Sequence, residues 1–368
     1  MRITYIIESL SNSGGMERVV TTKANWLKDN ANHDVTIITF AQEPEVNDYF
    51  PLSDKVNRVK YFFEVFNTND LFYSLTDWLK NNPQDICIST YGREFNILPQ
   101  IKDGSKKIVE FHFAYDVNEQ WQAVLSANLK SYVIGKLKTW RMTHTAIKYD
   151  KIVCLTKADY KKWRKHTEKV IQIYNPLTIY STKTSDCTPK QIIAIGRMDM
   201  QKGFDFLIDC WEKIEDKHPD WQLEIFGNGD ASILREQISN LGLQHIKIHG
   251  PTNNVPDILR KSSIYVLSSR YEGFPLIICE AMSCGLPIVA FDCPSGPAEL
   301  ISDGENGYLI KRVGDIKTMA NHLSHLIEHE NLRKSFGKKS LQMSKKYTLD
   351  HVMQKWINLF NQIIYPQN

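Results

Sequence analysis

The stretch Tyr-Glu-Gly-Phe-Pro-Leu-Ile-Ile-Cys-Glu, residues 271–280, places two carboxylates eight positions apart around a Gly-Phe-Pro turn that leads into an apolar run. The pattern predicts a helix that begins near Leu276, with Glu272 just before it and Glu280 about two turns inside it, so that both acids face one cleft. A helix N-terminus offers unpaired N–H donors and partial positive charge, which suit a phosphate or a sugar oxygen. Since carboxylates accept hydrogen bonds from hydroxyl groups, the stretch indicates a ligand with a diphosphate and many hydroxyls, such as a nucleotide sugar. The alternative is a surface loop before a buried helix whose acids are incidental.

The composition is that of a soluble globular protein with room for two domains. The chain has 368 residues, of which 42% are hydrophobic and 24% are charged, and this length suffices for two domains with separate cores. No apolar run approaches the ~20 residues that a membrane-spanning helix needs, and the N-terminus is predicted to be a first strand rather than a signal peptide. The seven cysteines are scattered and form no CxxC pair, so we expect a reducing, cytoplasmic location and no structural zinc site.

Short runs rich in Val, Ile and Leu alternate with amphipathic stretches along almost the whole chain. Such runs between helices are typical of buried parallel strands in α/β units. Two series of them predict an α/β protein with two Rossmann-like, doubly wound parallel sheets. The first series is Ile3–Ile7, Val35–Phe40, Ile86–Thr90, Lys107–Phe111, Ile152–Leu155 and Val170–Tyr174, and the second is Ile192–Ile195, Gln222–Phe226, Ile246–Ile248, Ser263–Leu267, Ile288–Phe291 and Gly307–Leu309.

The boundary between the two domains is expected in Asn175–Lys190, which is rich in Pro, Thr and Ser and shows no periodicity. We therefore assign residues 1–174 to an N-terminal domain and residues 175–350 to a C-terminal domain. Residues 351–368 stand apart, because His351–Ile364 has apolar residues at helical spacing over a wide face and must pack on something. This helix either covers its own domain or crosses back to the first one.

Two loops after predicted strands carry residues that suit an anionic ligand. The first βα connection contains Gly14 and Gly15, and paired glycines let a ligand approach the backbone and the start of the next helix. Arg197 and Lys202 follow Ile192–Ile195, at the carboxyl end of a parallel strand, where open α/β sheets bind ligands. Arg offers phosphate a planar fork and Lys a point charge, so the pair suits a diphosphate. The alternatives are a flexible turn and an exposed basic pair without a ligand.

Other residues also follow predicted strands and are expected at the carboxyl ends of the sheets. His112 follows Lys107–Phe111 and could hydrogen-bond a sugar hydroxyl, although a lone histidine is often structural. Gly227 lies in a glycine-rich strand end, and the loop that contains Pro251 offers backbone groups that could pair with the edge of a base.

Taken together, these residues resemble the retaining GT-B glycosyltransferases of family 4, the glycosyl transferases group 1, of the type that builds bacterial surface glycans. The resemblance covers nearly the whole chain and rests on four motifs: Glu272 and Glu280 in the spacing E-x7-E, Gly196-Arg197 with Lys202-Gly203, Gly14-Gly15-Met16-Glu17, and Asn175-Pro176. It implies two Rossmann-like domains that face each other across a cleft. The N-terminal domain would take the acceptor, the C-terminal domain would hold the nucleotide sugar, and the final helix commonly returns to the N-terminal domain.

The resemblance also implies roles for single residues. Glu280 would hold the ribose hydroxyls and Glu272 the hydroxyls of the transferred sugar. Arg197 and Lys202 would neutralise the diphosphate as the glycosidic bond breaks, Gly15 would approach the diphosphate from the opposite wall, and His112 would meet the donor sugar near its reacting carbon. The expected catalytic set is Glu272, Arg197, Lys202 and His112, and the expected donor-binding set is Gly14, Gly15, Glu280, Gly273, Phe274, Leu276, Ile277, Gly227 and Pro251.

The implied reaction moves a hexose or N-acetylhexosamine from a nucleotide diphosphate sugar, UDP-linked in our expectation, to a glycan or lipid-linked glycan acceptor. Retention is expected through attack by the acceptor on the front face, with the leaving phosphate taking the acceptor's proton. Neither a resident cofactor nor a metal is expected. No Asp-x-Asp strand end is evident as a metal clamp, and fixed Arg and Lys side chains can meet the developing charge.

Positive charge is concentrated in one part of the chain. Residues 101–170 contain fifteen Lys and Arg against seven Asp and Glu, which indicates an anionic partner. Ser126–Lys148 interleaves apolar residues with cations, and Lys161–Lys165 places a Trp among cations. Because helices of this kind can lie on anionic lipid, we expect the N-terminal domain to dock on the cytoplasmic face of the inner membrane and to reach a polyprenyl-diphosphate-linked acceptor. The alternative is a solvated basic helix face.

Two other functions are compatible with the same residues. A GT-B-type sugar-nucleotide epimerase would consume the donor without an acceptor, and a non-catalytic nucleotide-sugar binder would serve as an assembly partner. Nucleic-acid binding could explain the basic region, but the chain has no nucleic-acid motif that we recognise, and no such partner is expected. The identity of the donor sugar and of the acceptor stays open, because both depend on contacts with individual hydroxyls.

Overall fold

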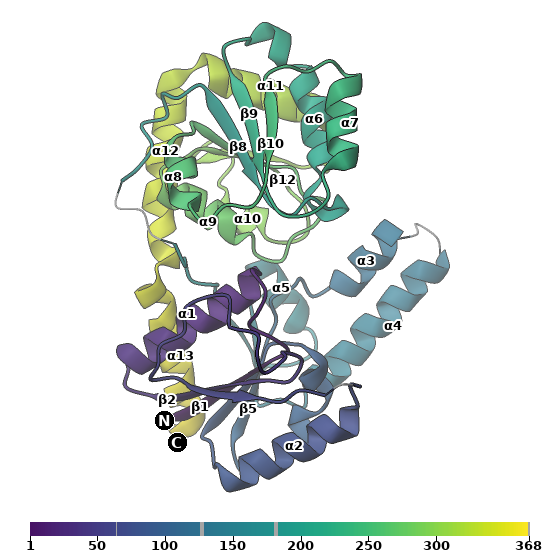
Figure 1. The fold of residues 1–368 in the computed structure, drawn as a ribbon, viewed down its shortest axis with the longest axis vertical. Helices are drawn as coiled ribbons and strands as arrows, with labels where there is room; N and C mark the ends of the chain where they lie inside the picture. The colour runs from purple at the N-terminus through teal and green to yellow at the C-terminus, as the bar shows by residue number, and fades with distance from the viewer. Residues whose placement is uncertain (64, 126–128, 180–182, 367–368) are drawn as a thin grey trace. The chain divides into compact units, whose positions relative to one another are not determined.

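The computed structural model describes residues 1–63, 65–125, 129–179 and 183–366, and the chain divides into two units (Figure 1). Unit 1 is Met1–Thr178 together with Leu349–Asn368, and unit 2 is Ile179–Thr348. Three parts of the sequence predictions lie outside the described residues: 180–182 of the expected linker, 126–128 of the basic segment, and 367–368 at the C-terminus.

Unit 1 is a seven-stranded parallel sheet in the order β3-β2-β1-β4-β5-β6-β7. Its strands are β1 (Arg2–Ile7), β2 (Asp34–Thr39), β3 (Asn57–Lys60), β4 (Ile86–Ser89), β5 (Lys106–Glu110), β6 (Lys151–Cys154) and β7 (Val170–Gln172). Its helices are α1 (Gly15–Asp29), α2 (Thr68–Asn81), α3 (Val117–Leu125), α4 (Leu129–Ala146), α5 (Lys157–Trp163) and α13 (Leu349–Ile364), with short 3₁₀ turns η1 (Arg93–Asn96) and η2 (Leu98–Gln100). The strand order reverses at β1, which pairs with both β2 and β4.

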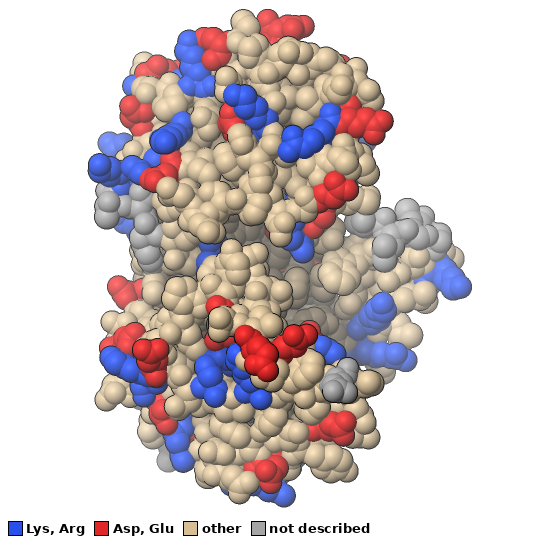
Figure 2. Space-filling view, viewed as in Figure 1, with Lys and Arg blue, Asp and Glu red and all other residues tan. Residues whose placement is uncertain are grey.

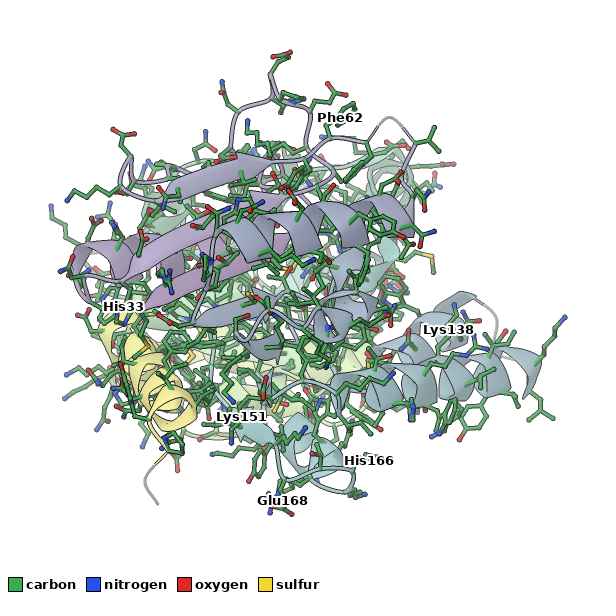
Figure 3. The ribbon with its side chains drawn as sticks, turned by 90° about the horizontal axis from the view of Figure 1, so that it is seen from below. His33, Phe62, Lys138, Lys151, His166 and Glu168 are labelled. Carbon is green, nitrogen blue, oxygen red and sulfur yellow. The ribbon has the colours of Figure 1, made fainter. Side chains whose placement is uncertain are left out.

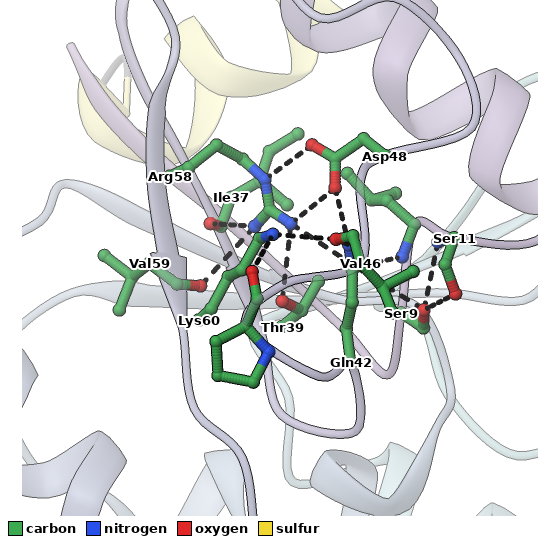
Figure 4. A network of polar contacts seen from close by, with 12 residues as sticks. Ser9, Ser11, Ile37, Thr39, Gln42, Val46, Asp48, Arg58, Val59 and Lys60 are labelled. Carbon is green, nitrogen blue, oxygen red and sulfur yellow. Dashed lines mark hydrogen bonds and ion pairs between the residues drawn. The ribbon is translucent and has the colours of Figure 1, made fainter.

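All six strands predicted for unit 1 are confirmed, and β3 was missed. Only Val59 in Asn57–Lys60 is apolar, so this edge strand has no hydrophobic pattern. It is held instead by Arg58, which donates two hydrogen bonds of 2.8 Å to the Asp48 carboxylate and one of 2.9 Å to Ile37 O (Figure 4). A long-range polar contact of this kind leaves no periodic signal in the sequence.

Unit 2 is a six-stranded parallel sheet in the order β10-β9-β8-β11-β12-β13, and its six predicted strands are confirmed. They are β8 (Gln191–Ile195), β9 (Gln222–Phe226), β10 (Ile246–His249), β11 (Ile264–Leu267), β12 (Ile288–Phe291) and β13 (Gly307–Ile310). The helices are α6 (Phe204–Glu212), α7 (Ser232–Asn240), α8 (Val255–Arg260), α9 (Leu276–Ser283), α10 (Pro297–Leu300), α11 (Ile316–Glu328) and α12 (Glu330–Ser344), with 3₁₀ turns η3 (Met200–Lys202), η4 (Glu215–Lys217) and η5 (Lys345–Tyr347). The order reverses at β8, between β9 and β11.

Each unit has its own hydrophobic core between sheet and helices. Ile6, Ile38 and Val109 of the sheet pack with Leu75 of α2 in unit 1, and unit 2 buries Ile192 and Val266 against helices such as α6. The α/β prediction of two doubly wound parallel sheets is therefore correct. Among the residues that the structure describes, no helix combines the length and the hydropathy needed to cross a membrane.

The last helix, α13, belongs to unit 1 although the sequence before it belongs to unit 2. Trp26 of α1 donates a 2.7 Å hydrogen bond from Nε1 to Asp350 Oδ1. The ammonium of Lys23 lies 4.3 Å from the centre of the fully buried Trp356 ring and also pairs with the buried Glu110 carboxylate. The apolar face of this helix thus covers a buried charge as well as apolar side chains.

Candidate active site

The loops that leave β8 and β11 meet where the strand order of unit 2 reverses, and they bring together Lys202 and Glu272. Lys202 Nζ lies 2.7 Å from Glu272 Oε1, and Ser269 Oγ donates to the same oxygen at 2.7 Å. The side chains of Lys202 and Glu272 are only 15% and 7% exposed. Open α/β sheets bind ligands at this point of strand reversal, so the structure places a nearly buried ion pair where a ligand is expected.

The loop after β8 holds Lys202 in place through its backbone. The Asp199 side chain accepts from Lys202 N, and Ser268 Oγ donates to Lys202 O at 2.9 Å. Gly203 has φ +62°, and a Cβ on it would stand 2.2 Å from Ser268 O. Because only glycine fits there, the Lys202-Gly203 pair of the sequence motif has a structural reason.

Arg197 is at the same strand end but is much more exposed, at 68% of its side chain. Its guanidinium donates to Gln201 Oε1 at 2.8 Å and lies 3.2 Å from Asp199 Oδ2. An exposed ion pair of this kind is weak, so Arg197 can turn toward a ligand at little cost.

The turn that begins at Glu272 is braced by the loop after β12. Glu272 N donates to Pro294 O, and Ser295 N donates to Glu272 O, both at 2.7 Å. A Cβ on Gly296 would stand 2.3 Å from Pro275 Cδ, so the two loops are in close contact. The turn therefore has little freedom to move.

The predicted helix start at Leu276 is confirmed by α9. The N-cap residue of α9, Pro275, makes no side-chain cap, and a helix N-terminus of this kind offers its first N–H donors to a ligand. Gly273 and Ile277 are partly exposed and Leu276 is buried. The ring of Phe274 packs on Tyr347, 5.8 Å between centroids, so this residue can offer a ligand its backbone only.

Glu280 is buried in α9, at 2% exposure. Glu280 and Glu272 both affect the buried Tyr265. Burial raises the pKa of Tyr265 well above its ordinary value, and the negative charges of Glu272 and Glu280 raise it further. The Tyr265 hydroxyl donates to Ile195 O at 3.3 Å. The two carboxylates of the E-x7-E pattern thus both lie close enough to this buried tyrosine to raise its pKa.

Gly227 and Pro251 follow β9 and β10, on the other side of β8 from Glu272. A Cβ on Gly227 would stand 1.7 Å from Gly196 O, so the loops after β8 and β9 touch through backbone. Pro251 is exposed, and the neighbouring His249 stacks on Phe226, 4.3 Å between ring centres. These residues lie at the sheet end that carries Lys202, but they do not belong to the Lys202–Glu272 cluster.

Gly14 and Gly15 lie in unit 1 at the start of α1. The space beside Gly14 holds the carboxylate of Glu17, whose Oε2 lies 2.2 Å from where a Cβ on Gly14 would be. Burial raises the pKa of the Glu17 carboxyl, which also accepts hydrogen bonds from its own backbone N–H and from Asn12. A diphosphate at this helix start would have to displace Glu17.

His112 follows β5 in unit 1, with its side chain turned inward and 5% exposed. Its Nε2 lies 3.7 Å from Glu110 Oε2, and within the described part of the chain neither ring nitrogen has a hydrogen-bond partner. Burial lowers the pKa of His112 to about 4, so the ring is neutral at pH 7 and can both donate and accept one hydrogen bond.

Sequence reasoning missed Ser269 and Gly296. Ser269 comes two residues after β11, so a polar residue at that strand end was the available signal. Gly296 gave no signal of its own, because its role depends on the approach of a distant loop. Over the residues that are described, no group of three or more His, Cys, Asp or Glu side chains is arranged to hold a metal ion.

The chain is similar to known glycosyltransferases over nearly its full length. The profile of the family described as glycosyl transferases group 1 matches residues 181–343. A protein of Haemophilus influenzae named as an uncharacterized glycosyltransferase is 30% identical, over 96% of this chain and 98% of its own length. The chain belongs to the group 1 glycosyl transferases.

This glycosyltransferase is also similar to a second named relative in sequence and to a solved structure in fold. The amylovoran biosynthesis glycosyltransferase AmsD of Erwinia amylovora is 27% identical over 98% of this chain and 99% of its own length. A mutant of S. aureus TarM, crystallised with fondaparinux, α-GlcNAc-glycerol and UDP, shares 18% identity and has a TM-score of 0.78 over 98% of this chain and 99% of its own. That likeness agrees with the two parallel sheets and identifies the fold as GT-B.

Proposed function

We propose that this glycosyltransferase moves a hexose or N-acetylhexosamine, with retention of configuration, from a UDP-linked donor to a glycan or lipid-linked glycan in surface-polysaccharide assembly. The observation that carries the proposal is the Lys202–Glu272 pair at the strand reversal of unit 2, beside the uncapped start of α9. Two relatives support it: AmsD is named for amylovoran biosynthesis, and TarM was crystallised with UDP.

The donor would be held by carboxylates and backbone amides of unit 2. Glu280 would accept hydrogen bonds from the ribose hydroxyls and Glu272 from the sugar, and charge-assisted bonds of this kind strengthen where water is excluded. The N–H groups of Leu276 and Ile277 would donate to donor oxygens at the positive end of α9. Pro275 has no N–H to offer.

In the transfer itself, the bond between the sugar's C1 and the leaving phosphate oxygen breaks, and the electron pair goes to the diphosphate. The acceptor oxygen bonds to C1 from the same face, and its proton goes to the leaving phosphate oxygen. Lys202 is already fixed by Glu272, so its charge would need little reorganisation. Arg197 would add its charge at the same strand end, Gly15 and His112 of unit 1 would take the roles that the resemblance implies, and no metal would be required.

Calorimetric titration of the full-length protein with UDP- and GDP-sugars in EDTA tests the donor site. We expect one UDP-sugar to bind, and Glu280→Gln to weaken it at least tenfold because the amide is a poorer acceptor for ribose. Glu236→Gln on the exposed face of α7 is the matched control and should bind as wild type. Binding that appears only when Mg²⁺ is added back would overturn the metal-independent reading, and binding to no donor would overturn the site.

Turnover experiments distinguish the competing functions. NMR of a bound UDP-sugar incubated without acceptor should show an unchanged sugar, whereas formation of its epimer would identify a sugar-nucleotide epimerase. With an extracted glycan acceptor, the product should keep the donor's anomeric configuration. A protein that binds donor but never transfers it to any surface-glycan precursor would be the non-catalytic binder.

We further propose that unit 1 docks on anionic lipid through α4. This helix packs on α3 with small residues: Ser131, Gly135 and Thr139 are buried, and a Cβ on Gly135 would stand 2.9 Å from Glu119 Cα. The large residues of α4 therefore point away from α3. Leu129, Val133, Leu137 and Trp140, spaced as one stripe of a helix, are 47% to 78% exposed.

The charges beside this stripe suit anionic lipid rather than a neutral partner. α4 contains Lys130, Lys136, Lys138 and Arg141 and no Asp or Glu. Figure 3 shows α4, with Lys138 labelled, extending beyond the sheet of unit 1, and Figure 2 shows blue cations among uncharged atoms over this helix. Each such cation near an anionic bilayer contributes about 1 kcal/mol, and an apolar stripe between cations is typical of interfacial helices.

Co-sedimentation with vesicles tests the docking surface. Binding should require phosphatidylglycerol in a phosphatidylcholine vesicle and should fall at least tenfold in Val133→Asp. Ile233→Asp, at an even more exposed apolar position on α7, should bind as wild type. Binding that does not depend on anionic lipid would overturn the docking proposal, as would a stable dimer in solution that Val133→Asp dissociates, since a second copy would then cover the stripe.

A further inference from the structure

Two buried side chains of unit 1 approach the same carboxylate oxygen. Lys23 Nζ of α1 and His112 Nε2 both face Oε2 of Glu110 in β5, the lysine in direct contact and the histidine at 3.7 Å. The exposed fractions of the Lys23, Glu110 and His112 side chains are 0%, 2% and 5%. Because water hardly reaches any of the three, the charge that each one carries depends on the other two.

The strand places Glu110 and His112 on one face of the sheet. Phe111 N donates to Val153 O at 2.9 Å, so the pairing of β5 with β6 continues past Glu110 and side chains still alternate between the faces. Val109 and Phe111 point into the core that contains α2. Glu110 and His112 therefore point to the opposite face, where Lys23 of α1 meets them.

Aromatic rings enclose the Lys23–Glu110 pair. The Lys23 ammonium lies 4.3 Å from the centre of the Trp356 ring and 5.4 Å from that of Tyr5, and both rings are fully buried. Burial and the charge of Glu110 raise the pKa of Tyr5 well above its ordinary value, so this phenol is neutral, and a tryptophan carries no charge. Lys23 is therefore the cation that balances Glu110.

The charge state of His112 depends on this balance. Burial lowers the pKa of His112 to about 4, the Glu110 carboxylate acts in the opposite direction, and the Lys23 ammonium lowers the pKa further. The neighbouring elements β1 and α13 contribute Tyr5 and Trp356, which are uncharged. Without Lys23, the buried carboxylate would need another cation, and His112 is the base beside the same oxygen.

We propose that Lys23 and Glu110 are positioning residues, which keep the His112 ring neutral and direct its Nε2–H at Glu110 while a sugar reacts beside it. The inference rests on the proposed function, which gives His112 a place near the reacting carbon of the donor. Both ring nitrogens are buried, so a ligand at the small exposed part of the ring meets chiefly its charge. Positive charge develops on the sugar as the phosphate leaves, and an imidazolium at this point would oppose it.

Nitrogen NMR of the full-length protein labelled with ¹⁵N-histidine tests the inference without any transfer. His112→Gln assigns the His112 signals among the eleven histidines. In the wild type the ring should be neutral at pH 6, with its proton on Nε2. Lys23→Met should raise the pKa of His112 by about one unit or more, a tenfold gain in proton affinity. Lys28→Met, which breaks the partly exposed pair with Asp34 on the same helix, is the matched control and should leave His112 unchanged.

A double variant separates charge from packing. Lys23→Met/Glu110→Gln removes both charges with side chains of similar length, and a buried pair is lost at less cost than one of its members. The pKa of His112 should then fall back to the wild-type value or below it. A merely structural role of Lys23 would leave the double variant like Lys23→Met. The wild type decides the question even if Lys23→Met does not fold, because a ring that is charged at pH 6, or protonated on Nδ1 alone, would overturn the inference.

The pH dependence of transfer to the extracted glycan acceptor connects this charge balance to the reaction. In Lys23→Met the acid limb of kcat should move up by as much as the pKa of His112, while the KM for the UDP-sugar stays the same. The double variant should restore the limb. An unchanged His112 pKa in folded Lys23→Met would overturn the inference. A raised pKa with an unmoved limb would overturn the positioning role and the role of His112 together. A raised pKa in a protein that binds no UDP-sugar would support the charge balance and overturn the proposed function alone.

Discussion

Lys202 and Glu272 hold each other in a nearly buried ion pair, and any ligand at this site has to fit around that contact. Ser269 Oγ also donates to Glu272 Oε1, so the pair is part of a three-residue cluster. Removing one member of a buried pair leaves an uncompensated charge, whereas removing both can be nearly neutral. The cluster is therefore coupled in stability as well as in binding.

Glu272→Gln should lower the free energy of unfolding of unit 2 by about 2–4 kcal/mol, because Lys202 is left charged without its partner. The double variant Lys202→Met/Glu272→Gln should recover more than half of that loss. Urea unfolding followed by hydrogen exchange in unit 2 peptides measures both. A double variant no more stable than Glu272→Gln would mean that the two side chains are not coupled.

Glu94 gives unit 1 a dependence on pH. Burial raises the pKa of the Glu94 carboxyl from 4.5 to about 7. Between these two values the native state holds a proton that the unfolded chain has lost, so stability falls as pH rises from about 4.5 to 7. In Glu94→Gln this fall, at most about 3 kcal/mol, should be missing from urea unfolding of unit 1. Glu43→Gln, at an exposed position, serves as control, and an equal pH slope in wild type and Glu94→Gln would contradict the assignment.

How far a residue could be predicted depended on where its partners come from. Glu272 and Glu280 share a turn and a helix, so their spacing alone could predict that they lie near one another and that α9 begins at Leu276. Glu94 and Ser269 gain their roles from hydrogen bonds and strand order, which one sequence does not display. The same limit explains Glu17, which the motif marked but whose carboxyl the sequence could not place beside Gly14.

Among the elements, α4 departs most from the ordinary pattern of a surface helix. Its buried side is built from small residues, and the close approach of α3 depends on Gly135. The sequence suggested a basic, partly apolar segment, but it could not tell which side would face α3. That choice follows from side-chain size at the contact, which hydrophobicity does not report.

Gly135→Val should loosen the α3–α4 pair. A Cβ at this position would stand 2.9 Å from Glu119 Cα and 3.2 Å from Asn118 O, and these backbone atoms can yield only if α3 moves. Hydrogen exchange in both helices should accelerate at least tenfold while β1 and β4 stay protected. Lys138→Val, an exposed position of the same helix, controls for the poorer helix propensity of valine. Unchanged exchange in Gly135→Val would show that the pair does not depend on this contact.

The other strands were well predicted, because buried parallel strands are continuous apolar runs. β3 is the exception, and its polar edge depends on Arg58. Arg58 also connects this edge to the loop after β1: Asp48 accepts from both Arg58 and Gln42, and Gln42 Oε1 accepts from Leu10 N (Figure 4).

On the scale of the whole molecule, the two sheets and their separate cores followed from the pattern of the sequence, whereas the position of α13 followed only from the family resemblance. Its wide apolar face predicted that it must pack somewhere. The choice of unit 1 depends on Lys23, Trp26 and Glu110. Lys23 and Trp26 precede α13 by more than three hundred and twenty positions, and Glu110 precedes it by more than two hundred.

Trp356→Ala should destabilise unit 1 by about 3–5 kcal/mol, since it empties a fully buried site and removes the ring beneath the Lys23 ammonium. Hydrogen exchange in urea should show earlier opening of α1, α13 and β5, with unit 2 peptides unchanged. Tyr365→Ala, an exposed aromatic just after the helix, should leave both units as they are. Loss of protection in unit 2 alone would contradict the assignment of α13.

Because α13 completes unit 1, the first domain to be synthesised is the last to be finished. Unit 2 is a continuous stretch, Ile179–Thr348, and can fold while the ribosome is still adding the residues that unit 1 needs. Until then the Lys23–Glu110 pair is not covered by Trp356, and the apolar surface that α13 will bury stays exposed, where chaperones can bind it. Protease digestion of arrested nascent chains should find unit 2 resistant before unit 1, and the reverse order would show that the first sheet is stable without its final helix.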